Sequence, residues 1–186
     1  GAGGIIDRQL LTGEGERLDP RPIPLGSALY GLSPGVTFGG GCYLATWQDS
    51  SGMWAKRVTP AGVVLDSVPL HMPDTVYAYS CTDAAFGDSF FLVAWAGDSR
   101  LHGCRVTPAG AILDSTPLLL GGSWYAGFPQ VAFDGNNFLV VWRDGGDGGM
   151  QRCVRISQDG VVLDTADIIL GPAGGVYYPW NTLDVA

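Results

Sequence analysis

Three near-copies of one short motif divide the chain into repeats of almost equal length. The copies are YLATW at 43–47, FLVAW at 91–95 and FLVVW at 138–142, so their tryptophans lie 48 and 47 residues apart. Each copy is followed by an Arg-Val or Arg-Ile pair, then by a short turn, and then by a Leu-Asp pair. A fourth Leu-Asp pair stands near the start of the chain, at Leu18-Asp19. Self-similarity with a period of this size predicts a repeat architecture.

Each repeat contains four strand-like runs, which we name A to D in chain order, and helical periodicity is absent from the sequence. In the last repeat the runs cover about 130–133, 138–142, 150–157 and 161–170. An Asp-Gly-Asn-Asn segment between A and B is a tight hairpin signal. Run B is apolar throughout, which predicts burial on both faces. Four antiparallel strands every 47 to 50 residues is the size of one β-propeller blade.

Proline positions predict which strand lies at the edge of each blade. A proline follows the repeated Asp by three residues in three of the repeats, at Pro22, Pro69 and Pro117. Proline cannot donate a hydrogen bond to a β-ladder and is therefore confined to sheet edges and strand starts. We therefore expect run D to be the outermost strand.

The sequence thus predicts an all-β, propeller-like single domain with three full repeats and a split fourth. The repeats cover approximately 34–80, 81–127 and 128–175, with partial repeats at 5–33 and 176–186. The chain opens in a C-type strand (5–11) and closes in an A-type strand (183–186), so a ring built from it would lack one B strand. We expect further sequence or a second chain to fill that slot, because an open ladder invites aggregation. A β-sandwich with a chance repeat is the alternative.

The fullest copy of the repeat runs from Val131 to Trp142 and continues with Arg155 and Leu163-Asp164. It resembles a family of repeats, patterned V-A-F-D-G-x-x-F-L-V-V-W then R-V, G and L-D, found in large secreted or surface proteins of bacteria. The resemblance implies a propeller-like fold and an extracellular or cell-surface setting. It implies no particular activity, because such repeats are scaffolds.

Charge and cysteine content exclude several classes of partner and site. The chain has 10 Lys and Arg against 18 Asp and Glu, a net charge of −8, which disfavours nucleic acid and anionic membranes as partners. The longest apolar run, 90–96, is too short to span a bilayer. Cys42, Cys81, Cys104 and Cys153 contain no CxxC pair, and with two histidines in the chain a zinc site is not expected. We expect no disulfide and no cofactor.

Several motifs that suggest chemistry are better explained as turns or scaffold. The Gly-Asp-Ser triplets at 87–89 and 97–99 suggest a hydrolase nucleophile, but Gly, Asp and Ser are turn formers and no histidine follows His102. The run 144–149 suggests a calcium loop but lacks the ligand ladder and terminal Glu of an EF-hand, so we expect an acidic hairpin loop. An Arg and an Asp that recur in every repeat indicate a pairing or turn-capping role.

Residues that differ between the repeats are the better guide to function. In a propeller blade the B–C and D–A connections emerge on one face, and here they carry aromatic and acidic side chains. Such groups suit sugar rings or a protein hot spot. The predicted ligand-binding residues are Trp54, Trp124, Tyr125, Tyr178, Trp180, Asp49, Asp98 and Asp144.

These residues predict a non-catalytic binding or structural module, whose ligand is a glycan or a protein surface, in the extracellular setting that the resemblance implies. One alternative is a propeller enzyme acting on polysaccharide through the loop carboxylates of Asp49, Asp98, Asp144 and Asp147. Another is a purely structural assembly subunit. A third explanation is that the aromatic side chains only plug the tops of the clefts between blades.

Overall fold

The computed structural model describes residues 4–28, 34–49, 51–73, 78–98, 100–122, 126–146 and 148–172, and side chains for all of these except 28 and 78–80. Every regular element in these ranges is a β-strand. Nowhere in them is there a helix long and apolar enough to cross a membrane.

The strands form three four-stranded antiparallel sheets and one two-stranded sheet. Blade 1 contains β3 (Gly35–Gly39), β4 (Cys42–Asp49), β5 (Gly52–Val58) and β6 (Leu70–His71). Blade 2 contains β7 (Ala78–Gly87), β8 (Phe90–Gly97), β9 (Arg100–Val106) and β10 (Leu118–Gly121). Blade 3 contains β11 (Ala126–Phe133), β12 (Asn137–Asp144), β13 (Met150–Ser157) and β14 (Ile168–Pro172). The half-blade contains β1 (Gly4–Arg8) and β2 (Ile23–Ala28).

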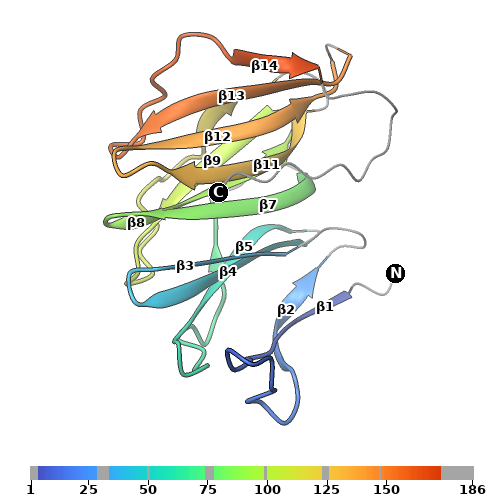
Figure 1. Cartoon of the computed structure of the whole chain (residues 1–186), viewed down its shortest axis with the longest axis vertical. Helices are drawn as coiled ribbons and strands as arrows, with labels where there is room; N and C mark the ends of the chain where they lie inside the picture. The colour runs from blue at the N-terminus through green and yellow to red at the C-terminus, as the bar shows by residue number, and fades with distance from the viewer. Residues whose placement is uncertain are drawn as a thin grey trace.

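The sheets follow one another along the longest axis of the molecule in chain order (Figure 1). The half-blade lies at one end of this axis and β14 of blade 3 at the other. Within each blade the strands lie in chain order, so the fourth strand is at the edge, as the prolines predicted. Pro22, Pro69 and Pro117 each stand directly before an edge strand, where their missing N–H costs no ladder bond. The fold is the predicted all-β arrangement of propeller-like blades.

The apolar B-type strands pack against the neighbouring sheets, and β8 of the middle blade has blade 1 on one face and blade 3 on the other. All eight residues of β8 are buried. The repeated Trp47, Trp95 and Trp142 lie in three separate clusters, each formed between one sheet and the next, and all three are almost fully buried. This confirms that they occupy equivalent core positions.

The fourth strand of blade 3 begins later than the sequence predicted. In blade 3 the predicted strand 161–170 is instead a turn followed by β14 from Ile168. Ser157 N donates to Val161 O (2.9 Å), Val162 makes an isolated bridge to Ile156, and the ladder resumes only at Ile168. Residues 161–164, whose alternating apolar and polar side chains suggested a strand, therefore lie in a turn that backbone hydrogen bonds close. The first strand is also shorter than predicted, 4–8 in place of 5–11, and the predicted strand 183–186 lies outside the described residues.

The repeated Arg and Asp close each C–D turn, as their recurrence indicated. Asp66 accepts a hydrogen bond from the backbone N–H of Arg57 (2.7 Å) and pairs with its guanidinium (2.5 Å). Arg105 with Asp114 and Arg155 with Asp164 repeat both contacts at 2.7 Å. In the half-blade, Asp19 pairs with Arg8. The four cysteines, all among the described residues, form no disulfide with one another, and burial is the largest cause of the raised pKa of Cys42, Cys104 and Cys153.

Candidate functional site

The structure aligns one variable row of side chains across each blade. The row starts at the repeated tryptophan on the second strand, crosses to its partner on the third strand, and ends on the edge strand. We call this the tryptophan row. Its members are Trp47–Trp54–His71 in blade 1, Trp95–His102–Leu119 in blade 2 and Trp142–Arg152–Ile169 in blade 3. The first position is a fixed core residue, whereas the second and third differ in every blade.

In blade 1 the tryptophan row ends in an aromatic pair. The rings of Trp54 and His71 lie 4.3 Å apart between centroids, tilted by 37°. The His71 Nε2 lies 3.3 Å from the backbone oxygen of Ser51, in the turn between β4 and β5. Trp54 is half-buried and His71 is exposed, so the pair borders solvent at the end of the blade.

A carboxylate stands beside this pair. Asp49, the last residue of β4, accepts hydrogen bonds from the backbone N–H (2.7 Å) and the hydroxyl (2.6 Å) of Ser51. The indole Nε1–H of Trp54 faces the same carboxylate without completing a hydrogen bond. Burial raises the pKa of Asp49, but these hydrogen-bond donors outweigh it and the net pKa is lowered. Asp49 is therefore an ionised acceptor at neutral pH.

The corresponding end of blade 2 carries no such cluster among its described residues. His102 stacks on Trp95, with ring centroids 6.1 Å apart, and its Nε2 lies 3.1 Å from Gly97 O. Asp98 is exposed in the following turn and has a positive φ of 49°. Asp88, in the other Gly-Asp-Ser triplet, has a φ of 35°. Both aspartates therefore lie in turns, which agrees with the sequence-based interpretation.

In blade 3 the carboxylate at this end is enclosed. Asp144 is fully buried, and its carboxylate lies 3.3 Å from the Arg152 guanidinium. Asp144 also accepts a hydrogen bond from the backbone N–H of Gly146 (3.0 Å). This carboxylate neutralises an arginine of the tryptophan row and closes the turn, so it is not displayed at the surface. The described residues contain no group of three side chains suited to a metal ion.

The structure thus brings together two of the predicted ligand-binding residues, Asp49 and Trp54, and places Asp98 and Asp144 apart from them. The remaining four lie outside the described residues: Trp124, Tyr125, Tyr178 and Trp180. Asp147, a candidate carboxylate of the enzyme alternative, lies outside them too.

Sequence reasoning missed three residues at these blade ends. His71 and Arg152 could have been found from strand register, because His71 pairs with Trp54 across β5 and β6, and Arg152 pairs with Trp142 across β12 and β13. Gln48 gave no sequence signal. It lies on the opposite face of β4 from Trp47 and is almost fully buried, and neither of its amide atoms has a hydrogen-bond partner among the described residues.

No family model matches the chain, and no curated protein sequence matches it. Among solved structures, the fold is similar to a mutant of the Aleuria aurantia lectin in complex with Fucalpha1-6GlcNAc, with a TM-score of 0.53 and 13% sequence identity. The match covers 94% of this chain and 56% of that lectin chain. The chain therefore spans little more than half of the length of the lectin it matches, and the likeness is one of fold.

Proposed function

We propose that the chain is a non-catalytic glycan-binding module of an extracellular or cell-surface protein. The observation that carries the proposal is the end of blade 1, where Trp54 and His71 form an aromatic pair beside the ionised Asp49. We call these three residues, with Ser51, the blade 1 cluster.

The chemistry of the blade 1 cluster suits a sugar. An aromatic ring offers an apolar face to the C–H side of a pyranose, and a carboxylate accepts hydrogen bonds from its hydroxyl groups. Small-molecule sites combine apolar walls with a few polar groups that fix orientation. The lectin neighbour, solved with a fucosylated sugar, supports the choice of glycan as ligand. The enclosure of Asp144 with Arg152 argues against a pair of working carboxylates at blade 3.

The decisive experiment is a glycan-array screen followed by calorimetric titration of the best binder, with Fucalpha1-6GlcNAc as the first probe. His71→Leu gives blade 1 the edge residue that blade 2 already has at Leu119, so the fold tolerates it. We expect His71→Leu and Trp54→Ala each to weaken binding at least tenfold, about 1.4 kcal/mol. Leu119→Ala is the matched control and should leave the affinity unchanged.

Absence of any glycan binding would contradict the proposal. Unchanged affinity in both Trp54→Ala and His71→Leu would remove the site from blade 1. In that case Trp124→Ala and Trp180→Ala test the ligand-binding residues predicted from the sequence at the D–A connections.

A further inference from the structure

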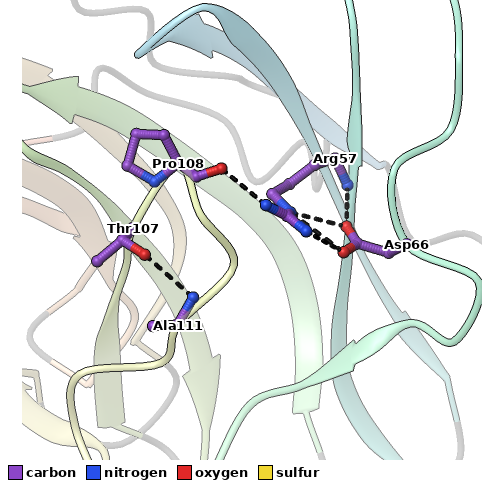
Figure 2. A network of polar contacts seen from close by, with 5 residues as sticks. All are labelled: Arg57, Asp66, Thr107, Pro108 and Ala111. Carbon is purple, nitrogen blue, oxygen red and sulfur yellow. Dashed lines mark hydrogen bonds and ion pairs between the residues drawn. The ribbon is translucent and has the colours of Figure 1, made fainter.

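At each step between described sheets, an arginine of one sheet contacts the C–D turn of the next sheet. Figure 2 shows the link between blades 1 and 2, where the Arg57 guanidinium donates to Pro108 O (2.8 Å) while holding Asp66. The guanidinium lies flat against Gly110, which has a φ of 87°. A Cβ at Gly110 would lie 2.7 Å from the central carbon of that guanidinium, so the contact requires a glycine there.

The same link recurs at the two other steps between described sheets. Arg8 of the half-blade lies on Gly62 of blade 1, and Arg105 of blade 2 lies on Gly160 of blade 3; a Cβ at either glycine would be 2.9 Å from the guanidinium. Three successive interfaces therefore use one arginine-on-glycine contact, always in the same direction along the chain.

A second contact accompanies this link at two steps. The A–B turn of a blade touches the same C–D turn of the next blade. A Cβ at Gly40 would lie 2.2 Å from the ring of Pro108, and Gln158 donates to the Asp88 carboxylate (3.1 Å). The equivalent A–B turn of blade 3 contains Gly135, and no heavy atom of the described part of the chain lies within 4 Å of a Cβ there.

Each end of the described stack carries one of the two groups that form the link. Blade 3 carries an arginine with no turn of a further sheet beside it among the described residues, and the half-blade carries a glycine turn with no described arginine on it. Arg155 of blade 3 holds Asp164 as its counterparts hold theirs, yet its side chain is 53% exposed, against 11% to 19% for Arg8, Arg57 and Arg105. At the other end, Gly15 of the half-blade occupies a turn of the same kind as the turn of Gly62 in blade 1. The N–H of Gly15 donates to Thr12 O (3.0 Å), as that of Gly62 donates to Thr59 O (2.8 Å), and the φ of Gly15 is 84° against 81° for Gly62. Among the described residues, no heavy atom lies within 4 Å of a Cβ at Gly15.

Each end of the stack also exposes one apolar residue whose counterparts in the other sheets are buried. Leu170 of blade 3 is 53% exposed, whereas Leu25, Met72 and Leu120, each six residues after the repeated Asp, are at most 4% exposed. Leu11 of the half-blade is 55% exposed, whereas Val58, Val106 and Ile156, which make the same isolated bridge, are at most 4% exposed. In every described blade-to-blade contact these two kinds of position are covered.

We propose that the chain assembles head to tail, with Arg155 of one copy seated on the Gly15 turn of a second copy. The two half-links cannot meet within the arrangement of one chain seen here, because the half-blade and blade 3 lie at opposite ends of its longest axis (Figure 1). Two different surfaces that complement each other make a heterologous interface, which propagates until it closes into a ring.

Charge at the predicted interface supports this pairing. The turn residue one before the glycine is Asp159 in blade 3, and its negative charge is among the causes that raise the pKa of Arg105. The corresponding residue of the half-blade turn is Glu14. Seated on that turn, Arg155 would meet Glu14 as Arg105 meets Asp159.

The experiment is size-exclusion chromatography with light scattering, and native mass spectrometry, on the full chain across a dilution series. We expect an oligomer at high concentration. Arg155→Glu breaks one surface and Leu11→Asp breaks the other, so each variant alone should be monomeric. Val68→Asp, at an exposed apolar residue outside both surfaces, is the control and should assemble as the unmodified chain does.

Mixing the two monomeric variants separates this interface from any other. Arg155→Glu retains an intact Gly15 turn and Leu11→Asp retains an intact Arg155, so an equimolar mixture should form a 1:1 complex that grows no further. Far-ultraviolet circular dichroism of each variant checks that it is folded. A monomeric unmodified chain at all concentrations, an oligomer that survives both variants, or a mixture that stays monomeric would each overturn the proposal.

Discussion

Replacing Gly110 with alanine should measure how much one blade-to-blade link stabilises the fold. Gly110 has a φ of 87° and lies against the Arg57 guanidinium, which hydrogen-bonds to Pro108 O. Gly148 is the matched control, because its φ is 72° and nothing lies within 4 Å of a Cβ there. Both substitutions impose an alanine on left-handed backbone, and only the first displaces an arginine.

The magnitude follows from these two terms. An alanine in the left-handed region costs roughly 1–2 kcal/mol, which both variants share. Moving Arg57 away also loses its hydrogen bond to Pro108 O, and a bond from a charged donor contributes about 1.5–3 kcal/mol. For a chain of this size 1 kcal/mol shifts Tm by about 2–4 °C, so we expect a loss of about 10 °C for Gly110→Ala and about 4 °C for Gly148→Ala.

Thermal and urea unfolding, followed by the fluorescence of the buried tryptophans, provide the measurement. In an Arg57→Ala background, Gly110→Ala should cost no more than Gly148→Ala, because the arginine that it displaces is already gone. Equal losses for the two glycines in the unmodified chain, or an undiminished Gly110 effect without Arg57, would refute the reasoning.

Two further measurements test the burial described above. Leu120→Ala should cost about 2–5 kcal/mol because it opens a cavity between blades 2 and 3, whereas Leu170→Ala, at the equivalent exposed position, should change the stability of the monomer little; similar losses in urea unfolding would contradict this. Burial raises the pKa of Cys104 from 9.0 to about 12, so its thiol should react with a thiol reagent only after unfolding. The unfolded chain ionises first, so this contribution to stability is complete below about pH 9 and is lost as pH rises from there towards 12, a decline that Cys104→Ala should reduce.

The sequence predicted the blades well because their strongest determinants repeat. The tryptophans, the apolar second strands and the Arg and Asp of each C–D turn recur at one period, and each recurrence corresponds to the same contact in the structure. The third strand of blade 3 was predicted with its observed bounds, 150–157. Where the structure differs, a local hydrogen-bond pattern overrides the apolar pattern, as in the turn at 157–161.

The half-blade shows why some partners could not be predicted. Leu10, and not an arginine, donates its backbone N–H to Asp19 (2.8 Å), so the motif has lost its usual spacing. Arg8, the last residue of β1, supplies the guanidinium from two residues earlier. The blade 1 cluster depends similarly on register: His71 meets Trp54 only because the edge strand pairs at that residue.

The tryptophan row separates the residues that hold the protein together from those that give each blade its chemistry. The same position on the third strand carries Trp54 in blade 1, His102 in blade 2 and Arg152 in blade 3. The tryptophan that pairs with this position on the second strand is the same in all three blades, and so is the arginine three residues further along the third strand. Mutation can therefore change what a blade displays without disturbing how it stacks. Because the rows recur at equal steps, a head-to-tail array would present each kind of surface many times, and weak individual sites would then act together through avidity.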